Sequence, residues 1–85
     1  MENLSKSEEI FIVCMEECGE LIQACSKMIR TKGKLKYILD LQDEIGDVVT
    51  MIEIMKEHGF CNEQQINKRM QEKKEKLKKW SNIYD

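Results

Sequence analysis

The feature that most constrains this fold is an almost unbroken series of helical signals. Proline is absent from all 85 residues, and only four of them are glycine. Apolar residues recur every three or four positions, a spacing that places them on one face of an α-helix. Charged residues make up 35% of the chain, which suits the exposed faces of such helices. The sequence therefore predicts an all-α protein, and its length predicts a single domain over residues 1–85.

The first two helices are expected to form a hairpin. Ser5 and Glu8 match a capping box, in which each side chain accepts a hydrogen bond from the other residue's backbone amide. The first helix is therefore expected from near Ser5 or Ser7 to residues 31–33. The second is expected from about residues 34–37 to about residue 57. Because the connector is short, the two helices should be antiparallel neighbours.

A third helix is expected after a stop signal at Gly59. It should begin after Asn62, which together with Gln65 forms a capping signal, and reach about Trp80. Its few apolar residues are Ile66, Met70, Leu77 and Trp80. Such a helix packs along a narrow seam or lies against a partner subunit. We therefore expect a helical bundle that forms on oligomerisation, as a homodimer or homotetramer.

Several classes of protein are disfavoured by the same sequence. The first ten residues are acidic, unlike the basic start of a secretory signal, and no apolar run is long enough to span a membrane. A cytoplasmic location is expected. The basic run over residues 68–79 lacks interleaved aromatic residues, so no nucleic-acid binding is expected. Three thiols share one helical stripe and are expected to be buried, without zinc-site spacing: Cys14, Cys18 and Cys25.

Two pairs of acidic residues stand out within the expected hairpin. The first carboxylate pair is Glu17 and Glu20, and the second is Glu44 and Asp47. Residues three apart share a helix face, so the two pairs converge if the helices pack as a hairpin. Four like charges in one volume are unfavourable unless a cation binds among them, and Mg²⁺ prefers oxygen ligands. We expect these four acids to bind a metal.

The alternative is that these acids are ordinary surface residues. No lysine or arginine follows any of the four by one turn, where a helix-surface acid usually finds its partner. The pairs also border apolar positions, which should leave them partly buried and in need of a counter-charge. Gly19 and Gly46 occupy the same place in each pair. A mid-helix glycine costs about 1 kcal/mol relative to alanine, so we expect the two helices to approach closely there.

A family resemblance adds to this interpretation. The strings Glu17-Cys18-Gly19-Glu20 and Glu44-Ile45-Gly46-Asp47, in this order and separated by residues 21–43, are similar to the paired motif of the MazG-like all-α nucleoside triphosphate pyrophosphohydrolases. The resemblance covers roughly residues 8–80. The related phosphoribosyl-ATP pyrophosphatases typically carry a Tyr-His pair soon after the second motif. Val48 and Val49 follow Asp47 here, which disfavours that subgroup.

The resemblance implies Mg²⁺-dependent hydrolysis of a (deoxy)nucleoside triphosphate to the monophosphate and pyrophosphate. A metal-bound water, with its pKa lowered, would attack the α-phosphorus. Arg69 and Lys73, one turn apart on the third helix, resemble the basic residues that reach the substrate phosphates in that family. One carboxylate would accept the proton of the attacking water, and the sequence leaves the choice open. The candidate catalytic residues are Glu16, Glu17, Glu20 and Glu44.

A non-enzymatic function is the second hypothesis from the sequence. The chain is small, and its third helix has little to pack with. A helical interaction module, or a module that senses nucleotides without turning them over, could bind a divalent cation through the same acidic residues.

Overall fold

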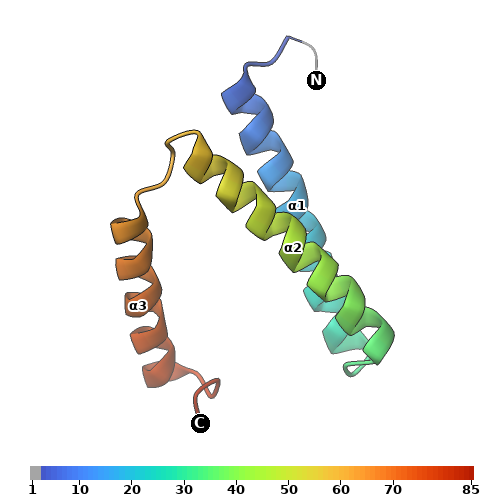
Figure 1. The fold of residues 1–85 in the computed structure, drawn as a ribbon. Coiled ribbons are helices and arrows are strands. Elements are labelled where there is room, and N and C mark those ends of the chain that lie inside the picture. Colours follow the sequence, from blue (N-terminus) through green and yellow to red (C-terminus); the bar gives the residue numbers. More distant parts are fainter. Residues whose placement is uncertain (1–2) are drawn as a thin grey trace.

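The computed structural model describes residues 3–85, and within them it contains three α-helices and no strand (Figure 1). The helices are α1 (Lys6–Arg30), α2 (Leu35–Glu57) and α3 (Glu63–Trp80). The predicted all-α class is confirmed for this part of the chain, as are the predicted helix ends. No helix among these residues is both long and apolar enough to cross a membrane.

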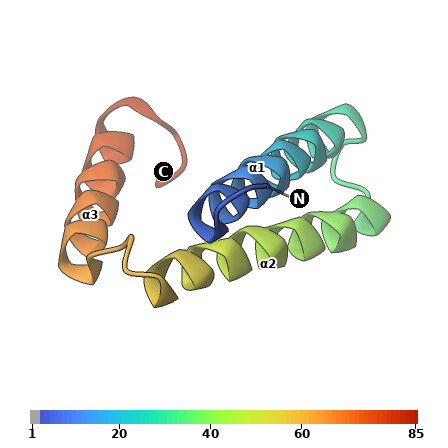
Figure 2. The ribbon, with the colours of Figure 1, turned by 90° about the horizontal axis from the view of Figure 1, so that it is seen from above.

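Local hydrogen bonds set the ends of the hairpin. The Glu8 amide donates to Ser5 Oγ at 3.1 Å, and the Ser5 amide donates to Glu8 Oε1 at 3.0 Å, which completes the capping box. After α1 ends at Arg30, with Thr31 as its C-cap, the chain reverses through Gly33, whose φ of 77° is strained for residues with a side chain. The helices α1 and α2 then run side by side in opposite directions (Figure 2).

The two helices face each other along one stripe each. Ile10 on α1 and Met51 on α2 are the buried apolar residues, each with 7% exposure. The half-buried positions of α1 continue in helical steps through Glu17, Leu21 and Ala24. On α2 the buried and half-buried positions are Tyr37, Ile38, Leu41, Glu44, Val48, Met51, Ile54, Met55 and Lys56. Glu17 and Glu44 therefore lie on the inward faces themselves, whereas the sequence placed them beside the apolar stripe.

A second apolar stripe on each helix is left uncovered. On α1 it follows alternating steps of four and three residues: Phe11, Met15, Cys18, Ile22, Cys25 and Ile29. Ile22 and Ile29 are 70% and 81% exposed. The prediction of buried thiols is wrong for Cys18 and Cys25, which are exposed, whereas Cys14 is half-buried. A two-helix hairpin covers only one stripe of each helix, and the covered stripe of α1 does not contain these two thiols.

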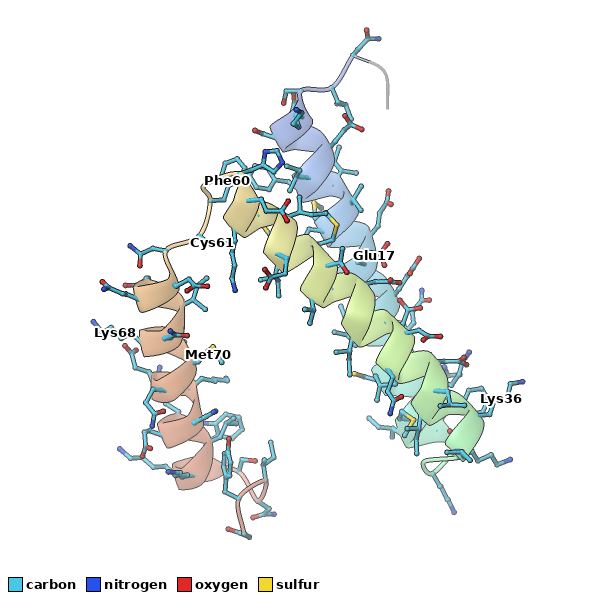
Figure 3. The ribbon with its side chains drawn as sticks, in the orientation of Figure 1. Glu17, Lys36, Phe60, Cys61, Lys68 and Met70 are labelled. Atoms are coloured by element: carbon cyan, nitrogen blue, oxygen red, sulfur yellow. The ribbon has the colours of Figure 1, made fainter. Side chains whose placement is uncertain are left out.

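The helix α3 stands apart from the hairpin. It diverges from α2 after the connector, and no Cα atom of α3 lies within 8 Å of one in α1 or α2 (Figure 1). Asn62 caps it as predicted, since Asn62 Oδ1 accepts a hydrogen bond from the Gln65 amide at 3.0 Å. Figure 3 shows Met70 on the side of α3 that faces α2, and Lys68 on the opposite side. Met70 is 51% exposed, so the apolar seam of α3 is uncovered.

Two side-chain contacts among the described residues join α3 and its connector to the hairpin. Lys56 Nζ on α2 lies 3.3 Å from Glu63 Oε1 at the start of α3. Phe60 in the connector packs on Phe11 of α1, with ring centroids 4.9 Å apart. These contacts hold the first turn of α3 near the open end of the hairpin and leave the rest of the helix without packing.

Candidate metal centre

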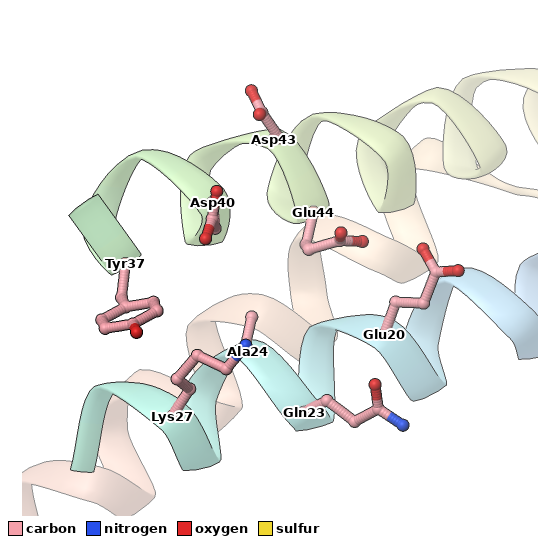
Figure 4. A pocket seen from close by; sticks show the side chains of 8 residues that line it. All are labelled: Glu20, Gln23, Ala24, Lys27, Tyr37, Asp40, Asp43 and Glu44. Atoms are coloured by element: carbon pink, nitrogen blue, oxygen red, sulfur yellow. The ribbon is translucent and has the colours of Figure 1, made fainter. Parts of the chain in front are cut away.

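The two carboxylate pairs meet across the hairpin. One carboxylate oxygen each of Glu17, Glu20, Glu44 and Asp47 lies within 4.8 Å of those of the other three. We call these four residues the carboxylate cluster. Figure 4 shows the Glu20 and Glu44 side chains reaching toward each other from α1 and α2. The structure thus brings together the four acids that the sequence predicts to converge.

Two members of the cluster hold a carboxylate oxygen away from water. Glu17 and Glu44 are half-buried, whereas Glu20 and Asp47 are exposed. The Oε2 atoms of Glu17 and Glu44 are inaccessible to solvent and accept no hydrogen bond from the described residues. A buried polar atom without a partner costs free energy, and nearly all such atoms in native proteins are paired. These two oxygens are therefore available to an electropositive ligand.

The electrostatics of the cluster also favour a bound cation. Burial raises the pKa of Glu17 above its ordinary value, and the nearby charges of Glu20 and Asp47 raise it further. Burial also raises the pKa of Glu44, together with the neighbouring Glu20 carboxylate. Ion pairs within residues 3–85 join Lys56 to Glu53 and Glu63, Arg69 to Glu72, and Lys78 to Glu75. None of them neutralises the cluster.

The donor set fits a hard divalent cation. All four donors are carboxylate oxygens, the ligand type that Mg²⁺ and Ca²⁺ prefer. Opposite ligands of an octahedral Mg²⁺ ion are about 4.2 Å apart, since each bond is about 2.1 Å long. The 4.8 Å limit on the cluster is slightly wider. Small rotations of the exposed Glu20 and Asp47 side chains would close it around the ion.

The other predicted site residues lie outside the cluster. Glu16 is exposed on α1. Arg69 and Lys73 are on α3, where Arg69 Nη1 lies 3.4 Å from Glu72 Oε2 and Lys73 Nζ lies 5.5 Å from the Trp80 ring centroid. Because α3 does not pack on the hairpin, a single chain does not bring these two basic residues to the carboxylates.

The expected close approach at the two glycines is wrong. A Cβ atom built at Gly19 or Gly46 would meet no neighbouring atom within 4 Å. The inward faces pass through Glu17 and Glu44 instead, so both glycines point away from the contact between α1 and α2. The spacing of the carboxylates is therefore enough to predict the cluster, and the two glycines add nothing to that prediction.

A cavity that the sequence analysis missed adjoins the cluster. It has a volume of about 340 Å³ and shares Glu20 and Glu44 with the cluster (Figure 4). Tyr37 and Asp40 line it from α2, and Lys27 lines it from α1. Tyr37, Asp40 and Glu44 follow steps of three and four residues, so they share one helix face with the second carboxylate pair. That spacing is a signal in the sequence that could have revealed the cavity.

Comparisons of the chain with protein-family models, with curated proteins and with solved structures found no match. The function is therefore inferred from the geometry of the cluster together with the motif resemblance.

Proposed function

We propose that this protein is a Mg²⁺-dependent hydrolase of the MazG-like kind, which converts (deoxy)nucleoside triphosphates to the monophosphate and pyrophosphate. The observation that carries the proposal is the carboxylate cluster, above all the buried and unpartnered oxygens of Glu17 and Glu44. A cation bound there would supply the missing partner. The order and spacing of the two acidic motifs then favour the pyrophosphohydrolase family over other metal proteins.

The residues of the cluster differ in what they can do. Burial holds Glu17 and Glu44 in place, so they are suited to fix the position of an ion. Glu20 and Asp47 are exposed and can adjust as substrate enters. When bound, Mg²⁺ neutralises phosphate charge and lowers the pKa of water. A cluster carboxylate is the best-placed proton acceptor, because Glu16 lies outside the group.

The site also needs positive charge for the phosphates. Arg69 and Lys73 have suitable chemistry, since guanidinium and ammonium groups bind phosphate oxygens. They are remote from the cluster of their own chain. We therefore propose that they act on the cluster of a neighbouring subunit. Basic residues outnumber acidic ones in α3, and acidic residues outnumber basic ones in the hairpin, so α3 of one copy is attracted to the hairpin of another.

The uncovered apolar stripes supply the surface for such an assembly. A chain of this length exposes too large a fraction of its surface to be very stable alone, and oligomerisation is a common remedy. The stripe containing Ile22 and Ile29 has the spacing of a helix–helix seam. Pairing it with a second copy would produce the homodimer, or through two such contacts the homotetramer, that the sequence predicts.

The proposal is tested by incubating the protein with each common nucleoside triphosphate and Mg²⁺ and measuring pyrophosphate. We expect release with at least one nucleotide and its loss in Glu44→Gln. Glu16→Gln is the matched control, because it makes the same chemical change outside the cluster. Absence of pyrophosphate from every nucleotide would refute the hydrolase assignment.

A non-catalytic module is the second candidate, favoured by the unpacked α3 and the exposed apolar stripes. In that case the cluster would hold a structural cation, or bind a nucleotide without turnover, while the helices bind a partner. Thermal melting separates these alternatives. A divalent cation alone would raise Tm in the structural case, and a non-hydrolysable triphosphate would raise it further in the sensing case.

A further inference from the structure

We infer that the cavity beside the carboxylate cluster binds the base of the nucleotide and that it selects guanine. This inference rests on the proposed function, because it takes the cluster as the place where the phosphates are held. Its volume of about 340 Å³ lies within the range of about 300–1,000 Å³ that is typical of small-molecule sites. It is lined from both helices of the hairpin, so it exists in a single chain.

The charges around the cavity decide which end of the nucleotide enters it. Four carboxylates line it, against the single ammonium group of Lys27: Glu20, Asp40, Asp43 and Glu44. This excess of carboxylates repels a triphosphate but admits an uncharged base. A second hollow, lined by Glu17, Asp47, Thr50 and Met51, lies on the other side of the cluster. It is nearer to the end of α2 that leads to the basic α3, so the phosphates belong on that side.

The spacing along α2 suits a nucleoside. Asp40 lies one helical turn before Glu44 and Tyr37 about two turns before it, roughly 6 Å and 10 Å along the helix axis. A phosphate held at the cluster would leave room for the sugar before the base reaches these side chains. Figure 4 shows the Tyr37 ring extending from α2 toward α1, where Lys27 lies on the facing helix.

The aromatic ring supplies a stacking surface. Tyr37 is half-buried, and the ammonium groups of Lys27 and Lys36 lie 5.3 Å and 5.6 Å from its ring centroid. Any of the nucleobases can stack on an aromatic side chain, because each of them has a π-face. Lysine side chains are flexible, so a base can take the place of the Lys27 ammonium on the ring and leave it free to bind an oxygen atom at the base edge.

The polar groups of the cavity supply the selectivity. No ion pair within residues 3–85 involves Asp40 or Lys27, although both line the cavity. A carboxylate can accept two parallel hydrogen bonds. Of the common bases, only guanine presents two adjacent N–H donors, N1–H and the N2 amino group. Its O6 atom, next to them, is an acceptor for Lys27, and lysine contacts to O6 are established chemistry.

Assembly through the uncovered stripes would leave this cavity open. Consecutive residues of a helix are rotated by about 100°, so residues two apart lie on roughly opposite sides. In the exposed stripe, Ile22 is two residues from Glu20 of the cavity. Ile29 is likewise two residues from Lys27. A second copy seated on the stripe therefore covers the far side of α1.

The test measures binding of α,β-methylene analogues of dGTP, dATP, dCTP and dTTP to the full chain by calorimetry in Mg²⁺. We expect the dGTP analogue to bind at least about tenfold more tightly than the other three, because a site built for paired donors rejects bases that lack them. Asp40→Asn should remove most of this preference. Tyr37→Leu should weaken all four analogues. Mg²⁺ binding without nucleotide should be unchanged in both variants.

Glu57→Gln is the control, because it also removes one carboxylate charge from α2. Glu57 is exposed at the end of that helix and belongs to neither the cavity lining nor the cluster, so this variant should keep the preference. Equal affinity for the four analogues, or a preference that survives Asp40→Asn, would overturn the inference. Turnover is scored separately with natural nucleotides. Pyrophosphate release without base preference refutes only the guanine site, and selective binding without release refutes only the hydrolase. Absence of both analogue binding and pyrophosphate release refutes both.

Discussion

The α1–α2 hairpin and α3 are all helical, but they differ in what their contacts accomplish. The hairpin packs along its length and brings four carboxylates into one cluster. The helix α3 is anchored at its first turn only and leaves its basic side chains spread along an exposed helix. The difference teaches that helix formation here is local, whereas a chemical site requires a second helix opposite the first. Under the proposed function, that second helix comes from another copy for α3.

The largest expected effect comes from neutralising the centre of the hairpin. Glu44→Gln should lower pyrophosphate release at least about 100-fold, since even residues that only support metal ligands commonly contribute 10- to 100-fold. The same variant should raise the Tm of the metal-free protein, because it removes one of several like charges from a partly buried site. Full activity in Glu44→Gln would remove the cluster from the mechanism.

A change on the uncovered stripe tests whether the hairpin and α3 are joined by assembly. Ile22→Asp should convert an oligomer to monomers, as measured by light scattering on a sizing column, because a charge would be buried in the seam. In a protein that works as a monomer, this substitution at a 70% exposed residue should be almost neutral. Gln23→Asp is the control and should leave the mass unchanged, because it adds the same charge at an exposed residue on the cavity side of α1, rotated about 100° from Ile22.

Removing the basic residues of α3 should have an intermediate effect. Arg69→Ala and Lys73→Ala should each raise KM for the nucleotide, by about tenfold, while Mg²⁺ binding stays the same, because each removes a charged contact to phosphate. Mixing an Arg69→Ala protein with a Glu44→Gln protein should restore part of the activity if the two regions meet between subunits. No recovery after subunit exchange would show that α3 and the hairpin do not share a site across an interface.

The pH dependence of the hairpin should be moderate and opposite to that of α3. The pKa values of Glu17 and Glu44 are raised in the folded protein, so the folded state holds more protons than the unfolded state. The metal-free cluster should therefore gain stability as pH falls through these raised values, until the ordinary carboxylate range is reached. In α3, Lys78 lowers the pKa of Glu75, so its contribution is lost on acidification.

Thermal melts of the wild type and Glu44→Gln over about pH 8 to pH 5 would isolate the cluster. The difference between the two proteins should shrink toward low pH, where Glu44 is protonated. The rise in Tm caused by Mg²⁺ should also shrink, since protons and the cation compete for the same oxygens. A difference that grows toward low pH would contradict the raised pKa of Glu44.

The smallest effect is expected at the junction of the two regions. Lys56 pairs with Glu53 and Glu63 on the protein surface. Lys56→Ala should change the free energy of unfolding only slightly, because ion pairs at the protein surface contribute little. Hydrogen exchange should nevertheless become faster in the first turn of α3. Unchanged exchange there would mean that other contacts anchor the helix.

Much of the fold follows from neighbouring residues. The caps at Ser5 and Asn62 are hydrogen bonds to residues three positions away, so the helix ends could be predicted well from sequence. The carboxylate pairs follow in the same way, since a separation of three residues places two side chains on one face of any helix. The short connector makes the helices antiparallel neighbours, and the packing that turns Glu17 and Glu44 inward brings the pairs together.

What the sequence determined by itself was therefore the three helices, their ends and the four acids that meet. Tertiary structure alone decided the rotation of each helix about its axis. Both stripes of α1 have helical spacing, and only packing against α2 selects the one containing Glu17 over the one containing Cys18 and Cys25. That rotation exposed the thiols, left the glycines without neighbours and opened the cavity at Tyr37. The physical cause of this rotation is the burial of side chains that are far apart in sequence. The spacing of residues within one helix cannot show which of its stripes will be buried.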